Sequence, residues 1–143
     1  MTTARTLRFL WAAICSGGAL VLAVFGGLVV SGSGGSLGEH GEAAFYTVAL
    51  VGLVGLIGAF ALLRRMEGRL LQAGSDAEAE SVVQSYGVAA LAAVEGVAVA
   101  GGVAAFLSGD LLPLAFGAPL FAFAWLTWPS DARVAHWLAL RQR

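Results

Sequence analysis

Four long apolar runs dominate the sequence, and none of them contains a lysine, arginine or histidine. A helix that crosses a membrane needs about 20 predominantly apolar residues, which is close to the length of each run. Because lipid cannot hydrogen-bond to backbone N–H and C=O groups, an apolar run that crosses a bilayer must be helical. The sequence therefore predicts an all-α membrane protein with four transmembrane helices in an up-down bundle. The expected spans cover residues of about 9–31, 44–63, 82–107 and 111–128.

The composition agrees with a membrane protein made of one domain over residues 1–143. Only 12% of the residues are charged and 59% are hydrophobic, whereas about 25% of the residues of a soluble domain are charged. A net charge of −1 and the absence of lysine leave no basic surface for nucleic acid. The single cysteine, Cys15, lies inside an apolar run, which excludes a disulfide scaffold.

The basic residues predict the orientation, because cytoplasmic loops of membrane proteins carry an excess of arginine and lysine. All eight are arginines, and they precede the first run, separate the second from the third, or follow the fourth: Arg5 and Arg8; Arg64, Arg65 and Arg69; Arg133, Arg141 and Arg143. Both termini and the middle loop are therefore expected in the cytoplasm. An even number of spans independently requires both termini to lie on the same side of the membrane. The richness in alanine and glycine without lysine suggests a bacterial protein, so we expect a multi-pass protein of the inner membrane.

The first run has an alternative interpretation as a cleaved signal peptide. Arg5 and Arg8 would form its positively charged segment, and Ser31 and Ser33 would be small residues near the cleavage site. The apolar stretch is longer than a usual signal peptide has, and no A-x-A site follows it. The interpretation as a membrane span is preferred.

Aromatic residues and the C-terminal segment give further expectations about the membrane interface. Trp11, Trp125 and Trp128 fall near the expected cytoplasmic interface, where tryptophan is enriched. After the fourth run, Val134 and Trp137 recur at helical spacing. This spacing predicts a short amphipathic helix over about 131–141 that lies on the inner leaflet. The alternative is a frayed tail. Trp137 is expected at the interface as well.

Glu95 is the residue that costs most to place in a bilayer, because it stands near the middle of the third run. An acidic side chain at the bilayer centre costs about 2.5 kcal/mol or more. No basic residue occurs in the four runs, so we expect Glu95 to bind a proton or to pair with another chain. Ser16 and Thr47 are candidate hydrogen-bond partners within the chain. The alternative role is structural, with a protonated carboxyl that joins two helices.

Glycine and alanine are abundant around Glu95 and in the second run. Small residues let membrane helices approach each other closely, and we expect that packing either within one bundle or between subunits. The residues expected at helix contacts are Gly52, Gly55, Gly58, Gly96, Gly101 and Gly102.

The segment 90–107, ALAAVEGVAVAGGVAAFL, resembles the carboxylate helix of the c subunits (proteolipids) of rotary ATP synthases. In that family an acidic residue at mid-membrane is followed six residues later by glycine and then by an apolar tail with phenylalanine, as in Glu95, Gly101 and Phe106. The resemblance implies a carboxyl that binds and releases a proton, and a ring of identical subunits. Here the glycines of the second run are spaced by three, and two further spans flank the hairpin. The whole chain also resembles small uncharacterised bacterial four-span proteins, which brings no activity.

No sequence motif indicates an enzyme, a cofactor or a metal site. The only histidines are His40 and His136, outside the spans, so a haem between helices lacks ligands. His40 with Glu39 and Glu42 is interpreted as a solvated loop. If an ion binds at Glu95, the sequence favours H⁺ over Na⁺, since the next residue, Gly96, offers no side-chain oxygen.

Two functions remain as hypotheses. The first is a proton-binding membrane protein like a c subunit, which forms a homo-oligomer. The second is a non-catalytic accessory subunit of a larger membrane complex, in which Glu95 is a buried hydrogen-bonding group. In both, membrane lipids and other membrane subunits are the expected partners.

Overall fold

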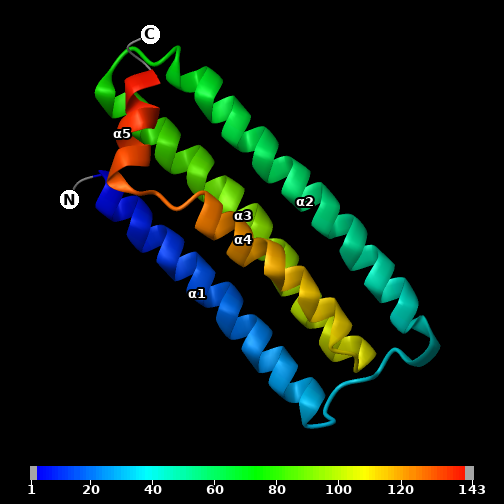
Figure 1. Cartoon of the computed structure of the whole chain (residues 1–143). Helices are drawn as coiled ribbons and strands as arrows, with labels where there is room; N and C mark the ends of the chain where they lie inside the picture. Colours follow the sequence, from blue (N-terminus) through cyan, green and yellow to red (C-terminus); the bar gives the residue numbers. More distant parts are fainter. Residues whose placement is uncertain (1–2, 141–143) are drawn as a thin grey trace.

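The computed structural model of the protein describes residues 3–140, without the side chains of Thr3 and Glu39. Helices and short connections make up this part of the chain, and it contains no strand. The prediction of an all-α protein is confirmed. In chain order the elements are α1 (Thr3–Val30), η1 (Gly38–His40), α2 (Gly41–Leu70), α3 (Asp76–Ser108), η2 (Leu112–Gly117), α4 (Ala118–Leu126) and α5 (Asp131–Ala139), shown in Figure 1.

Three of these helices are long and apolar enough to cross a membrane, namely α1, α2 and α3. They contain 28, 30 and 33 residues, and at 1.5 Å per residue each is longer than the hydrocarbon core of about 30 Å. These lengths indicate a multi-pass membrane protein.

The fourth apolar run does not form the single helix predicted over 111–128. It consists of the 3₁₀ segment η2 followed by α4, and the axis then bends by 72° into α5. Proline lacks an N–H and disfavours a helical conformation in the residue before it, and Pro113, Pro119 and Pro129 divide this part of the chain. Together η2 and α4 extend about 25 Å, at about 2.0 and 1.5 Å per residue. This segment is therefore shorter than the other three.

The segments pack around α3. The helices α1 and α2 lie on opposite sides of α3 and make no extended contact with each other, while η2 and α4 cover a third side. The chain reverses direction at each connection from α1 to α4 (Figure 1). The arrangement is thus centred on one helix, rather than shared evenly among four helices as in a simple up-down bundle.

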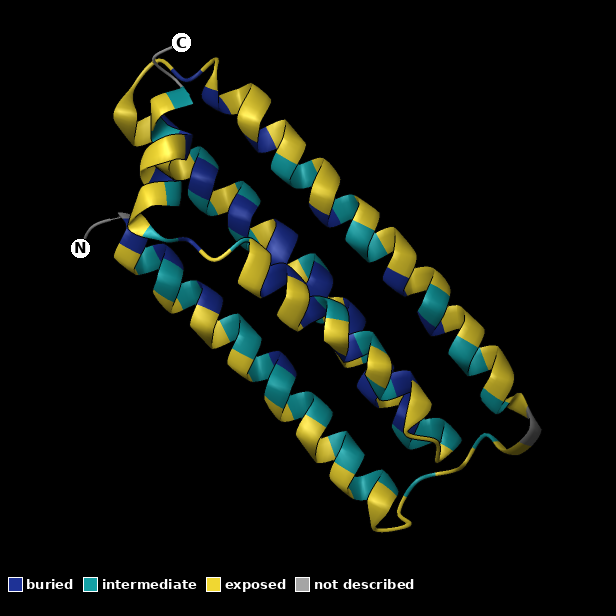
Figure 2. Ribbon diagram, viewed as in Figure 1, coloured by how far each residue is buried: buried dark blue, intermediate teal, exposed yellow. Residues whose placement is uncertain are grey.

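Burial follows from this arrangement. Most of the dark blue residues in Figure 2 lie on α3, whereas α2 is largely yellow along its outer side. Large apolar side chains of α2 are exposed, including Leu53, Ile57 and Phe60, each with more than half of its surface accessible. No charged or polar residue is buried among residues 3–140. An apolar outer surface of this extent fits contact with lipid acyl chains.

Small residues of α2 and α3 allow the close contacts. A Cβ atom at Gly55 would lie 2.7 Å from Val97 Cγ2, and one at Gly101 would lie 2.7 Å from the Pro113 carbonyl oxygen. Gly52 faces Val97, and Gly102 faces Phe25 of α1. Each of these four glycines therefore lies where another segment approaches.

Gly58 and Gly96 contact no other segment of the described chain, so of the two kinds of packing expected for them only packing between subunits would involve them. Nothing within the described part of the chain comes within 4 Å of a Cβ atom placed at either residue. Gly96 is exposed on the side of α3 that no other segment covers. A three-residue interval does not keep Gly58 on the face of Gly52, since each step of three turns the helix surface by about 60° away from its start.

Local signals fix both ends of α3. Ser75 is the N-cap, and its hydroxyl accepts a hydrogen bond from the Glu78 backbone N–H at 3.2 Å. The Glu78 carboxylate accepts one from the Gly74 N–H at 2.8 Å, so Ser75 and Glu78 form an arrangement close to a capping box. At the other end Gly109 has φ of 71°, a left-handed conformation that glycine adopts without strain. This turn leads directly into η2.

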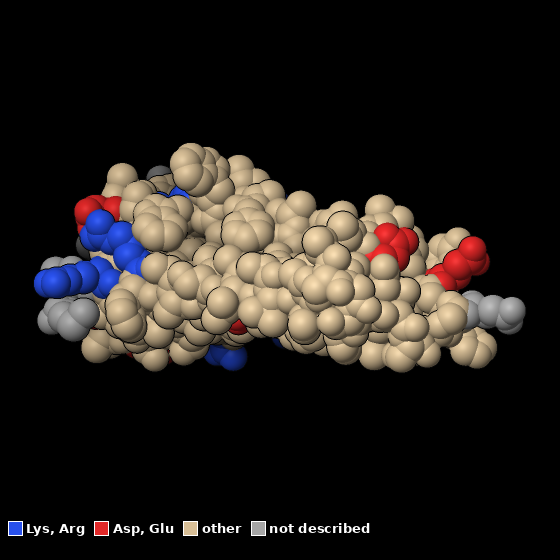
Figure 3. All heavy atoms as spheres, turned by 90° about the horizontal axis from the view of Figure 1, so that it is seen from below, with Lys and Arg blue, Asp and Glu red and all other residues tan. Residues whose placement is uncertain are grey.

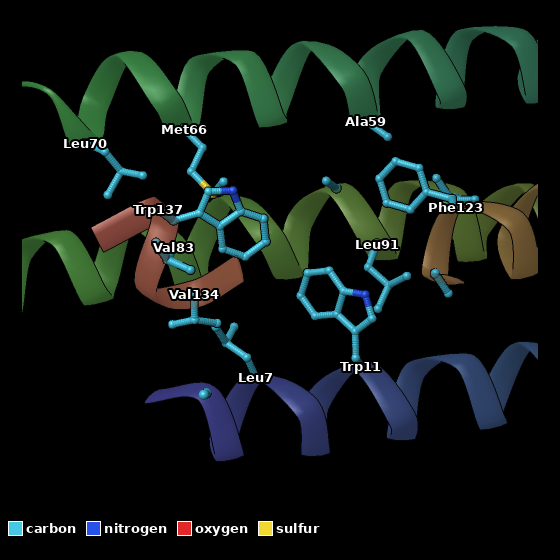
Figure 4. Close-up of a cluster of buried hydrophobic side chains, with 14 of the residues drawn as sticks. Leu7, Trp11, Ala59, Met66, Leu70, Val83, Leu91, Phe123, Val134 and Trp137 are labelled. Carbon is cyan, nitrogen blue, oxygen red and sulfur yellow. The ribbon is translucent and has the colours of Figure 1, made fainter. Parts of the chain in front are cut away.

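The C-terminal helix α5 closes the end of the structure that α4 does not reach. Its N-cap, Ser130, accepts a hydrogen bond from the Arg133 N–H, and Arg8 of α1 pairs with Asp131 at 2.8 Å. Figure 4 shows Val134 beside Leu7 and shows Trp137 pointing toward α2. The buried cluster at this end comprises Leu7, Met66, Leu70, Val83, Val134 and Trp137.

This packing corrects two expectations about the interface. The helix over 131–141 was predicted to lie on the inner leaflet, but the apolar face of α5 packs on α1, α2 and α3; residue 141 lies outside the described residues. Trp11 and Trp137 are 0% and 8% exposed, so both indoles lie in the protein core instead of in the lipid interface. The ring of Trp11 fits against Gly87, where a Cβ atom would lie 2.9 Å from it. Trp125 and Trp128, in contrast, are exposed.

We expect Gly101→Ala to destabilise the protein by about 1–3 kcal/mol, because the new methyl group meets the backbone oxygen of Pro113. Gly27→Ala, at an exposed position of α1, is the matched control. Its methyl group enters open space, and alanine is the better helix former by up to about 1 kcal/mol. Thermal unfolding in detergent, followed by circular dichroism, measures both. Equal midpoints for the two variants would contradict the packing of η2 on α3.

We also expect Trp137→Ala to loosen α5, since truncating a buried tryptophan costs about 3 kcal/mol or more. Mass spectrometry of tryptic fragments measures this, because Arg133 lies within α5 and is protected while the helix is docked. Cleavage after Arg133 is expected to accelerate about tenfold or more, given that free energy. The control is His136→Ala, which changes an exposed residue of the same helix. If both variants are cleaved at the wild-type rate, α5 is not held by Trp137.

Candidate functional site

Glu95 lies near the middle of α3 and faces α1 across a notch made by two glycines. A Cβ atom at Gly17 would lie 3.0 Å from Glu95 Oε1, and one at Gly18 would lie 3.5 Å from Glu95 Cγ. Because neither glycine has a side chain, the carboxyl group fits directly against the backbone of α1. Sequence reasoning identified Glu95 but not the two glycines that accommodate it.

The neighbours of this notch are apolar or weakly polar. Leu120 of α4 is fully buried, and its Cδ2 atom lies 2.5 Å from the position of a Cβ atom at Gly18. Cys15, two residues before Gly17 on α1, is partly buried. The site is thus formed by α1, α3 and α4, and no cation borders it among these neighbours.

The carboxyl group has no hydrogen-bond or ion-pair partner within residues 3–140. The two predicted partners do not bind it: the Thr47 hydroxyl donates to the Ala43 carbonyl oxygen at 2.8 Å, and Ser16 is exposed on α1 without a bond to Glu95. Glu95 itself is partly exposed. The carboxyl is therefore accessible from outside the helix cluster.

A face of small residues borders Glu95 on α3. Ala92 and Val99 are three residues before and four residues after Glu95, so they are its neighbours on the helix surface. The exposed residues of this face, which we call the open face of α3, are Ala89, Ala92, Gly96, Val99 and Val103. They recur every three or four residues and lie on the side that α1, α2 and α4 leave uncovered.

The other residues of the resemblance to c subunits have internal contacts. Gly101 packs against η2, and the ring of Phe106 lies 5.7 Å from that of Phe25 of α1. In the described structure these two residues pack α3 against its neighbours. Of the three residues that carry the resemblance, only Glu95 has an ionisable group.

Among the cavities, two lie at opposite ends of the structure, and sequence reasoning predicted neither. One, of about 830 Å³, lies where α2 begins and α3 ends; Glu42, Tyr46 and Asp110 are among its lining residues. The other, of about 370 Å³, lies where α2 ends; Arg65, Arg69 and Tyr86 are among its lining residues. No cluster of three or more residues suited to hold a metal occurs in the part of the chain that the structure describes. His40 is exposed near the first cavity, as expected for a solvated loop residue.

No protein-family model, curated protein or solved structure matches this chain.

We expect Glu95→Met to keep or raise the thermal-unfolding midpoint in detergent. Methionine has a similar length, and the change removes an unpaired carboxyl from an apolar site, where an acidic group costs about 2.5 kcal/mol or more. A carboxyl that joined two helices through a hydrogen bond would give the opposite result. A lower midpoint for Glu95→Met, with Glu42→Met at the exposed end of α2 unchanged, would indicate a structural role.

Proposed function

We propose that this chain is a small integral protein of the bacterial inner membrane that assembles into an oligomer or a larger membrane complex, and that Glu95 binds and releases a proton there. The observation that carries the proposal is the partly exposed carboxyl of Glu95 at mid-helix, which has neither a cation nor a hydrogen-bond donor within residues 3–140. The apolar helices and the position of the arginines support it.

The arginines support an orientation with both termini in the cytoplasm. Arg5 and Arg8 lie at the start of α1, Arg64 and Arg69 near the end of α2, and Arg133 in α5, and these parts share one end of the molecule (Figure 1). Figure 3 shows blue side chains gathered toward that end, only acidic ones at the opposite end, and a long stretch with little charge between them. This asymmetry fits the positive-inside rule.

The fourth segment reaches the length needed to cross the membrane only when α5 is counted as part of it. The segment η2–α4 is too short to cross fully, and α5 continues it to the arginine-bearing end after a bend. Trp125 and Trp128 are exposed in this region, as expected for residues at the cytoplasmic interface. We infer that all four segments cross the bilayer.

The contacts of Glu95 bear on which ion it would bind. An ionised carboxylate without a cation is strongly disfavoured in an apolar medium, whereas a neutral carboxylic acid is tolerated. The contacts with Gly17, Gly18 and Leu120 bring no side-chain oxygen to the carboxyl. A sodium ion requires several oxygen ligands, so H⁺ is the ion that this site fits.

Assembly is supported by the open face of α3. Small residues let a neighbouring helix approach closely in lipid, and Glu95 lies at the edge of this face. A helix from another copy or another subunit that packed there would approach the carboxyl. Loops this short leave no soluble domain for catalysis, so we do not propose an enzyme.

An accessory role remains the second candidate. In that role Glu95 forms a hydrogen bond whose donor is not among the described residues, for example one from another chain. Proton binding requires no such donor. The copy number of the intact assembly, measured by native mass spectrometry after gentle extraction, separates a ring of identical chains from one or two copies among unlike chains.

A hydrophobic carbodiimide tests proton binding, because it modifies a protonated carboxyl in an apolar site. In isolated membranes we expect Glu95 to be modified at neutral pH and the modification to fall at alkaline pH, as mass spectrometry of the intact chain would show. Glu95→Gln is expected to abolish it, whereas Glu42→Gln, at the exposed end of α2, is expected to leave it unchanged. Modification that does not depend on pH, or none at Glu95, would refute the proposal.

A further inference from the structure

The cavity at the end of α2 is lined by groups that donate hydrogen bonds. It has a volume of about 370 Å³ and lies between the last turns of α2 and an early turn of α3. Its polar lining consists of two guanidinium groups, one amide and one phenol, and no acidic residue lines it. The lining residues are Arg65, Gly68, Arg69, Gln72 and Tyr86.

The two arginines of this cavity carry positive charge that no side chain neutralises. Arg65 and Arg69 are four residues apart and thus on the same side of α2, where like charges repel each other. Neither makes an ion pair or a side-chain hydrogen bond within residues 3–140. Arg8, in contrast, pairs with Asp131, and Arg133 donates to the carbonyl oxygens of Leu126 and Trp128. Arg64, which does not line the cavity, has no such partner within the described residues either. The cavity therefore fits an anion.

The position of the cavity identifies the kind of anion. It lies at the arginine-bearing end, where the apolar surface of the helices stops, which is the level of lipid headgroups. From Arg65 toward the middle of α2, the same side of the helix continues as Ala61, Gly58 and Val54, four, seven and eleven residues earlier. Val54 is 62% exposed, and nothing described lies within 4 Å of a Cβ atom at Gly58. An apolar strip thus leads from the cavity into the membrane.

We infer that this cavity binds the phosphate headgroup of an anionic phospholipid, with an acyl chain along the strip of Ala61, Gly58 and Val54. Planar guanidinium groups match phosphate oxygens and donate two hydrogen bonds each. Basic pockets between membrane helices on the cytoplasmic side recognise anionic headgroups in this way. The cavity is open to its surroundings, so the glycerol part of the lipid can lie beside the phosphate, near Gln72 and Tyr86. The inference rests on the proposed insertion into the membrane but not on proton binding at Glu95.

Lipid binding to the purified full chain tests this inference. After delipidation in detergent, native mass spectrometry measures the bound fraction during titration with phosphatidylglycerol, and with phosphatidylcholine of the same acyl chains. We expect phosphatidylglycerol to bind about tenfold or more tightly than phosphatidylcholine. Each of Arg65→Gln and Arg69→Gln is expected to weaken its binding about fivefold, and the double variant about 25-fold.

Arg64→Gln is the matched control, because Arg64 precedes Arg65 on α2 but does not line the cavity. We expect it to change the affinity by less than about twofold, well below the effect of one lining arginine. Circular dichroism establishes that all variants are folded. Glu95→Gln is expected to bind lipid like the wild type, so a failure of the proton-binding proposal leaves this test intact.

Three results would overturn the inference. The first is a double variant that binds phosphatidylglycerol like the wild type. The second is an equal loss for Arg64→Gln and Arg65→Gln, which would indicate diffuse attraction to charge and no defined cavity site. The third is binding of inorganic phosphate as tight as that of the lipid, which would make the cavity a site for a soluble anion.

Discussion

The small side chains of α3 allow three other segments to approach its backbone, and the remaining features of the structure depend on that approach. In lipid the hydrophobic effect does not hold one apolar helix against another, so close van der Waals packing must do so. Gly87 accommodates the ring of Trp11, Gly101 lies against the Pro113 carbonyl, and Gly102 lies against Phe25. Larger residues at these positions would separate α3 from α1 and η2. Because α3 contacts α1, α2, η2, α4 and α5, the position of Glu95 along α3 also sets its position relative to these segments.

The same packing explains how a carboxyl is tolerated in the middle of the structure. Gly17 and Gly18 leave a notch in α1 that accepts the Glu95 side chain without a clash. The notch offers space but no charge and no hydrogen bond from a side chain. An acidic group in the middle of a membrane span costs free energy, and a proton or a partner group from another chain would offset that cost.

The two ends of the structure differ because the fourth segment is short. At the arginine-bearing end, α5 fills the space that α4 leaves, and Val134 and Trp137 join the core there. Beside it, the end of α2 projects with Arg65 and Arg69 on the wall of an open cavity. At the opposite end, the loop before α2 crosses the end of α3, where the Gly35 and Leu37 N–H groups donate to the Phe106 and Leu107 carbonyls. One end is thus closed by backbone hydrogen bonds and the other by a separate helix.

The sequence by itself determined which segments are helical and apolar, where α3 begins, where the arginines gather and which residue is costly in a bilayer. These properties are local. Each depends either on the free energy of transferring one segment into lipid or on the residue that caps one helix. Only the tertiary structure decided that Trp11 and Trp137 are buried, that Gly58 and Gly96 face open space, and that Glu95 lies against two glycines and not against Ser16 or Thr47. Hydropathy does not distinguish the two sides of a membrane helix, because both are apolar. The rotation of each helix is set by its fit against segments distant in the sequence, and that fit also brings Tyr86 beside Arg65 and Arg69.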